Sequence, residues 1–173
     1  MSFERPITIA DALSNIGQRR YLLPAIQREF IWPPSKIEWL FDSLMRGYPV
    51  SSFLFWYVEG ASSTGYRFYE FLRDYRERFK THNEEANVDQ ITSFTAVLDG
   101  QQRLTSLNIG LKGSFAWREP WGRKDTDDER NYPTRRLYLN ILNKLEDQED
   151  DRIYEFSFPS APPAPSARFS SIT

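Results

Sequence analysis

The chain has 173 residues, of which 40% are hydrophobic and 16% aromatic, so it is long enough for one domain with a buried core. It contains no cysteine and a single histidine, His82. This composition excludes a disulfide scaffold, a Cys-ligated zinc or iron–sulfur site, a cysteine nucleophile and a two-histidine metal site. The 22 basic and 24 acidic residues give a net charge of −2, which argues against a uniformly basic nucleic-acid-binding domain but allows a local basic patch.

No apolar run approaches the roughly 18 residues that a membrane-spanning helix needs. The first ten residues, MSFERPITIA, lack the apolar core of a signal peptide. We therefore expect a cytoplasmic protein with no membrane partner.

The first predicted element is a helix that begins after Thr8 and ends at Gly17. Thr8 and Asp11 form a capping-box pattern, and the apolar residues fall on one helical face: Ile9, Ala12, Leu13 and Ile16. Residues 19–34 contain Pro24, Pro33 and Pro34, so we expect this segment to be extended.

The strongest helical pattern covers residues 35–47. Ser35 and Glu38 form a second capping-box pattern, and Gly47 stands where a helix commonly ends. The apolar positions have helical spacing and form one stripe: Ile37, Leu40, Phe41 and Leu44.

The rest of the chain predicts alternating elements and a tail. We expect a buried strand at 52–58, a helix at 67–80, a strand at 94–99 followed by a helix after Gly100, a long loop at 113–135, and strands at 135–142 and 152–158. Residues 159–173 contain four prolines and no apolar period, so we expect a disordered tail or linker. The fold class is therefore a mixed α/β single domain over residues 1–158.

The segment VLDGQQR, residues 97–103, joins the predicted strand to the helix that follows. A helix beginning there presents free backbone N–H groups that attract anions, and Gly100 lets a phosphate approach closely. Arg103 can bind phosphate oxygens, Asp99 can hold a divalent cation, and Gln101 or Gln102 can orient a water molecule.

A purely structural interpretation of the same residues remains open. Asp99 is also a suitable N-cap, and a glutamine at the third helical position would complete a capping box. The chain has no GxxxxGK[ST] sequence, so a P-loop is excluded.

Residues 25–56, AIQREFIWPPSKIEWLFDSLMRGYPVSSFLFW, followed by VLDGQQRLTSL at 97–107, resemble the N-terminal domain of GmrSD-type modification-dependent restriction proteins. Related proteins include the phosphorothioate-sensing SspE proteins. The resemblance covers roughly residues 7–158 and implies a fold similar to that of ParB and sulfiredoxin.

The resemblance implies an NTP-binding and NTP-hydrolysing sensor domain in phage defence. The implied catalytic residues are Asp99, Gln101, Gln102 and Arg103, with Mg²⁺ at Asp99. The implied nucleotide-binding residues are Gly100, Gln27, Arg28 and Arg103. The Gln27–Arg28 pair is followed by two aromatic residues, Phe30 and Trp32, which are better explained as a cover for the core.

The resemblance also implies partners, which are modified DNA and an HNH nuclease domain or subunit. We expect the helical and nuclease regions of the family to lie outside this chain, and His82 to be a solvated loop residue. Gln101 replaces the cysteine of sulfiredoxin, which excludes sulfur reduction, and the single arginine of the turn does not match the arginine-rich turn of ParB. The alternative function is a non-catalytic DNA-binding or protein-interaction module.

The long loop predicted at 113–135 is also a candidate contact surface, because long structureless loops in compact domains are often functional. It carries two aromatic and two basic side chains suited to a modified base or a partner: Trp117, Arg118, Trp121 and Arg123.

Overall fold

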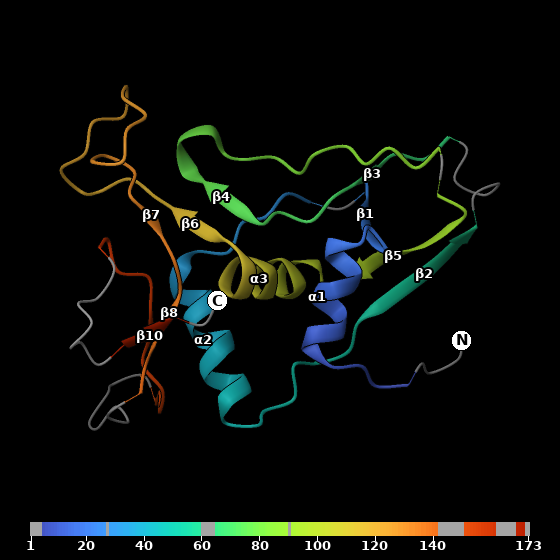
Figure 1. Ribbon diagram of the computed structural model, residues 1–173, viewed down its shortest axis with the longest axis horizontal. Helices are drawn as coiled ribbons and strands as arrows, with labels where there is room; N and C mark the ends of the chain where they lie inside the picture. The colour runs from blue at the N-terminus through green and yellow to red at the C-terminus, as the bar shows by residue number, and fades with distance from the viewer. Residues whose placement is uncertain are drawn as a thin grey trace.

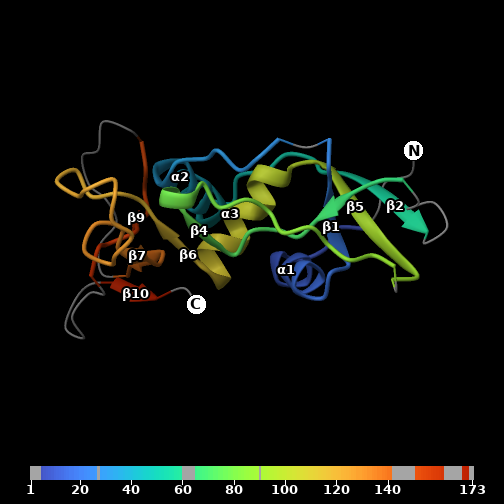
Figure 2. The ribbon, with the colours of Figure 1, turned by 90° about the horizontal axis from the view of Figure 1, so that it is seen from above.

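The computed structural model describes residues 5–26, 28–59, 65–89, 91–141, 151–161 and 169–171. Within these residues the chain forms three α-helices, α1 (Ile9–Gly17), α2 (Pro34–Met45) and α3 (Gln101–Lys112). Helix α3 lies in the middle of an elongated molecule, with strands at both ends (Figures 1 and 2). No helix in this described part of the chain is long and apolar enough to cross a membrane.

The first two helices follow the predicted pattern closely. Thr8 and Asp11 form the predicted capping box of α1. Helix α2 begins at Pro34 with Pro33 as its N-cap, and no side chain caps it. The predicted capping box of Ser35 and Glu38 is therefore wrong, because Ser35 already lies inside the first turn.

The apolar stripe of α2 is confirmed. Ile37 and Phe41 are buried, and Leu40 and Leu44 pack against the core. Gly47 has a φ of 75°, which suits the glycine that follows a helix end.

The strands form three sheets. The four-stranded sheet has the order β2 (Leu54–Glu59), β5 (Ser93–Asp99), β1 (Tyr21–Pro24), β3 (Phe68–Tyr69). The second has the order β4 (Asp74–Arg76), β6 (Ser114–Ala116), β7 (Thr134–Arg135). The third has the order β10 (Phe169–Ser171), β8 (Tyr138–Asn140), β9 (Phe156–Ser157). Strand β5 runs parallel to β1 and antiparallel to β2.

Strand β2 confirms the strand predicted at 52–58 but not its burial. It is an edge strand whose one hydrogen-bonded neighbour in the sheet is β5. Val58 is buried, whereas Leu54 and Tyr57 are exposed.

The prediction of a helix at 67–80 is wrong. Two short strands, β3 and β4, and a single 3₁₀ turn at Glu77–Phe79 occupy this segment. Tyr69 pairs with Leu23 of β1, and Tyr75 pairs with Phe115 of β6. These long-range strand pairs override a helical spacing that arose from a run of aromatic residues.

The C-terminal third is more strand-rich than predicted. Strand β6 lies inside the segment predicted as a loop at 113–135, and β7 and β8 divide the strand predicted at 135–142. Strand β9 lies within the predicted 152–158 strand. Strand β10 pairs antiparallel with β8, so at residues 169–171 the structure differs from the expected tail.

The main core surrounds α3, which contacts both α1 and α2. At Gly110 the two helices α2 and α3 approach so closely that an added Cβ would lie 2.6 Å from the ring of Phe41. Helix α2 also holds the segment before β9, because the buried carboxylate of Asp42 accepts the N–H groups of Ile153 (3.0 Å) and Tyr154 (2.8 Å).

Candidate functional site

The turn between β5 and α3 depends on glycine. Strand β5 ends at Asp99, and Gly100 then adopts a φ of 89° as the N-cap of α3. The ring of Phe53 occupies the place that a Cβ on residue 100 would need. Both the left-handed backbone and this packing therefore require glycine at position 100.

The capping-box interpretation of this turn is wrong. Gly100, not Asp99, is the N-cap, and no side chain forms a cap hydrogen bond. The Asp99 side chain is 72% exposed. The first turn of α3 thus begins without a side-chain acceptor for its N–H groups, and these groups carry the partial positive charge of a helix start.

Arg103 lies one turn into α3, and its side chain is only 16% exposed. It donates hydrogen bonds to the carbonyl oxygens of Val50 and Ser52, the second at 2.8 Å. Its guanidinium stacks 4.6 Å from the ring centroid of Phe53 and lies 3.5 Å from an Asp99 carboxylate oxygen. Arg103 therefore connects the segment before β2 to the start of α3.

Gln101 and Gln102 join the two sequence motifs across more than 70 residues. Gln101 Nε2 donates to the carbonyl oxygen of Arg28 at 2.8 Å. Gln102 donates through Nε2 to the carbonyl oxygen of Glu29 at 2.9 Å, and its Oε1 accepts the N–H of Ile31 at 3.0 Å. Both glutamines are buried, so their amides hold the 28–31 segment beside the helix start.

The first of the two sequence motifs, at residues 27–32, contacts the site mainly through its backbone. Phe30 is buried against Tyr75 and Phe115, and Trp32 packs on the core, as predicted. The Arg28 side chain is exposed and forms no polar contact within the described residues. Gln27 lies outside the described residues.

Two contacts near this motif could not be predicted from the sequence pattern. His82, expected to be solvated, is exposed but lies with Nδ1 2.9 Å from a carboxylate oxygen of Glu29. Phe53 lies under both Gly100 and Arg103. Each pair is far apart in the chain, so no local spacing rule could have joined them.

Asp99 is the candidate ligand for a divalent cation. Among the described residues, no three carboxylate or imidazole groups gather in a way that would hold a metal ion by themselves. A single carboxylate fits Mg²⁺ that is also bound by phosphate oxygens and water, which is the usual arrangement for this ion at nucleotide sites.

A surface hollow of about 630 Å³ lies at the opposite end of β5. Its lining comes from the end of α1 and the start of β5 and includes no residue of the DGQQR segment: Gln18, Arg19, Arg20, Asn87, Ile91, Thr92 and Ser93. Arg19 forms an ion pair with Glu70 at 2.8 Å. The hollow is therefore separate from the turn at Gly100.

The comparison of sequences identifies the family of this chain. No curated protein matches the chain significantly. Residues 9–167 match the profile of the family described as GmrSD restriction endonuclease, N-terminal domain. This match spans both motifs, the four-stranded sheet and α3, and the chain therefore belongs to the family of GmrSD restriction endonuclease N-terminal domains.

Proposed function

We propose that this domain binds a nucleoside triphosphate at the start of α3 and hydrolyses it, and that the nucleotide state controls DNA restriction. The observation that carries this proposal is the uncapped first turn of α3 behind Gly100, flanked by Arg103 and by the exposed Asp99. Such a turn offers backbone N–H groups to a phosphate, while an adjacent arginine and carboxylate can supply charge and a Mg²⁺ ligand.

The proposed roles follow from position. The N–H groups of residues 101 and 102 and the Arg103 guanidinium bind phosphate oxygens, and Asp99 binds Mg²⁺. Arg28 is exposed beside this turn and approaches the nucleotide from the other motif. Gln101 or Gln102 orients the attacking water, which requires one of these amides to exchange its main-chain partner on nucleotide binding.

The wider assignment is part of the same proposal. The strand–glycine–helix turn supports a fold of the ParB and sulfiredoxin type. The DNA substrate would carry a modification, and an HNH nuclease domain or subunit would cut it. The family match supports the link to restriction.

Asp99→Asn provides the cleanest test, because the side chain is 72% exposed and its loss should leave stability almost unchanged. Phosphate release is measured with each of the four common ribonucleoside triphosphates over a range of Mg²⁺ concentrations. We expect Asp99→Asn to lower turnover by at least tenfold and to raise the Mg²⁺ concentration required. Asp89→Asn, at an exposed residue outside the site, should behave like the wild type. Absence of both nucleotide binding and phosphate release in the wild type would overturn the proposal.

The alternative is a module that binds DNA or protein without hydrolysis. One observation favours it: the side chains of Gln101, Gln102 and Arg103 all bond to main-chain atoms and so already have a structural role. Gln102→Ala separates the two functions. If the domain hydrolyses nucleotide, Gln102→Ala should lower turnover more than it lowers nucleotide affinity. If the domain is a binding module, the same substitution should lower stability alone.

A further inference from the structure

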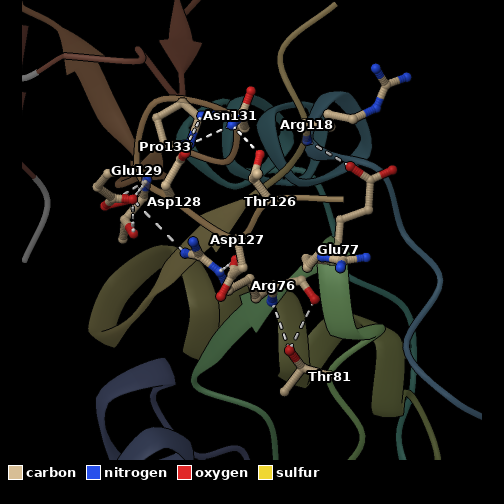
Figure 3. Close-up of polar contacts among 12 residues, drawn as sticks. Arg76, Glu77, Thr81, Arg118, Thr126, Asp127, Asp128, Glu129, Asn131 and Pro133 are labelled. Atoms are coloured by element: carbon tan, nitrogen blue, oxygen red, sulfur yellow. Dashed lines mark hydrogen bonds and ion pairs between the residues drawn. The ribbon is translucent and has the colours of Figure 1, made fainter. Parts of the chain in front are cut away.

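The 117–133 loop, between β6 and β7, is a folded structure held by its own hydrogen bonds (Figure 3). The N–H of Glu119 donates to the carbonyl oxygen of Asn131 at 2.8 Å, which closes the base of the loop. The Asn131 side chain accepts the N–H of Arg123 at 2.7 Å and donates to the Asp128 carboxylate at 2.8 Å. A loop fixed in this way can present side chains in defined positions.

Most acidic side chains of this loop form contacts within the chain. Four of the five form hydrogen bonds: Glu119, Asp127, Asp128 and Glu129. Arg76 of β4 lies 2.7 Å from Asp127 and 3.9 Å from Glu129, and Figure 3 shows this pairing beneath the loop. Glu119 pairs with Arg135, which is buried under Trp117. Arg76 and Arg135 therefore offset part of the loop's negative charge, whereas the Asp128 carboxylate bonds to the neutral Asn131 and the Glu129 side chain stays 65% exposed.

Three of the loop's four basic side chains remain on the outside, whereas the fourth, Arg118, donates to the carbonyl oxygen of Gly122 at 2.9 Å. Arg123, Lys124 and Arg130 are all exposed. Within the described part of the chain, none of these three side chains forms an ion pair or a side-chain hydrogen bond, and Asp125 is the loop's one carboxylate without such a contact. The exposed surface of the loop therefore carries three cations that no carboxylate of the described residues pairs with, together with exposed carboxylates such as Asp125.

Trp121 stands at the tip of a tight turn beside these cations. The N–H of Gly122 donates to the carbonyl oxygen of Glu119 at 2.9 Å, with Pro120 in the second position of the turn. Trp121 is 64% exposed, and the Arg130 guanidinium lies 6.0 Å from its ring centroid. By contrast, Trp117 packs against Phe115 and Phe158 in the core. Of the two tryptophans predicted as contact residues, only Trp121 is free to meet a ligand.

We propose that the 117–133 loop binds DNA, with Trp121 stacked on an unpaired base and with Arg123, Lys124 and Arg130 on the flanking phosphates. An exposed aromatic ring among unpaired cations matches the alternation of base and phosphate along a single strand. An acidic polypeptide would use the cations but would gain little from the ring. The choice of DNA as the polymer rests on the proposed function, whereas the surface itself is defined by the contacts of the loop.

This surface is separate from the nucleotide site. Helix α3 starts at that site, and its other end leads through β6 into the loop (Figure 1). Twelve helical residues correspond to a length of about 18 Å. DNA binding by the loop can therefore be measured in buffer without nucleotide.

The test is the fluorescence anisotropy of a labelled oligothymidylate strand, titrated with the full chain at low salt. We expect Trp121→Ala to weaken binding at least fivefold and Trp121→Phe to retain part of it, because base stacking depends on an aromatic face. Tyr57→Ala removes an equally exposed ring from β2 and should leave affinity unchanged. Arg123→Ala should reduce the slope of log affinity against log salt by about 0.7, the value for one phosphate on a single strand.

Wild-type binding that Trp121→Ala and Arg123→Ala leave unchanged would overturn the proposal, as would a lack of any binding to the strand. Equal displacement by polyglutamate, with no effect of Trp121→Ala, would also overturn it in favour of an acidic protein partner. Thermal melting of each variant, compared with the wild type, is the control for correct folding. If the chain binds no nucleotide but still binds DNA through Trp121, the loop assignment stands and the proposed hydrolysis fails.

Discussion

Glu38 is a partly buried carboxyl group on α2, with one oxygen 3.6 Å from Arg152. Burial raises the pKa of Glu38 above its ordinary value of 4.5, and the positive charge of Arg152 opposes this rise only in part. The folded protein therefore holds this proton to a higher pH than the unfolded chain does. The contribution of Glu38 to stability is then greatest below pH 4.5 and is lost as the pH rises through the folded-state pKa.

Glu38→Gln should show this dependence. The difference in unfolding free energy between variant and wild type should shift in favour of the variant as the pH rises from about 4 to about 7, because glutamine has no charge to desolvate. Urea unfolding at several pH values measures this difference, and the other carboxyl groups cancel in the comparison. A difference that is constant with pH, or that changes in the opposite direction, would contradict the buried position of this group.

Replacing Asp42 should have a larger effect on the unfolding free energy than replacing Glu38. Its fully buried carboxylate accepts two backbone N–H groups, those of Ile153 and Tyr154. Asp42→Ala leaves both donors without an acceptor and should cost roughly 2–5 kcal/mol of unfolding free energy. Asp89→Ala, at an exposed residue, should stay within about 0.5 kcal/mol of the wild type. Equal denaturant midpoints for the two variants would show that Asp42 does not hold the C-terminal segment.

At the scale of elements, Gly110 fixes how closely α3 can approach α2. Alanine is favoured over glycine inside a helix by about 1 kcal/mol. At position 110, however, a Cβ would lie 2.6 Å from the buried ring of Phe41, so Gly110→Ala should lower stability by about 1–3 kcal/mol.

Gly17 provides the matched substitution, because it ends α1 and an added Cβ there would meet nothing within 4 Å. Gly17→Ala should be neutral or stabilising by up to about 1 kcal/mol. Thermal unfolding of both variants gives the comparison. A stabilising Gly110→Ala would mean that the two helices are further apart than the structure has them.

Elements with a local cause were predictable from sequence. The capping box at Thr8, the stripe of α2 and the glycine between β5 and α3 each depend on neighbouring residues. The strands β3 and β4 were not predictable, because they exist only through pairing with β1 and β6. The candidate site divides in the same way. Its helix start was predictable, whereas the bonds of Gln102 and Arg103 to distant backbone segments were not.

For the molecule as a whole, β10 indicates that the tail contributes to stability. Its three residues pair with β8 at the edge of a sheet. A chain ended at residue 161 should lose about 1–2 kcal/mol, because its backbone hydrogen bonds are replaced by bonds to water. For a domain of this size that loss lowers the melting temperature by roughly 2–8 °C. A chain ended at residue 171 keeps β10 and should melt with the full chain. Equal melting temperatures for all three would restore the expectation of a disordered tail for the residues after 161.

The bonds of Gln101 and Gln102 also set an order of events during folding. They join residues 71 to 73 positions apart. Closing a loop of about 70 residues costs about 2.5 kcal/mol more entropy than closing a four-residue turn. Helix α3 and the β5 turn can therefore form early, while the 28–31 segment docks after the main barrier has been crossed. Losing the Gln102 amide should consequently speed unfolding more than it slows refolding.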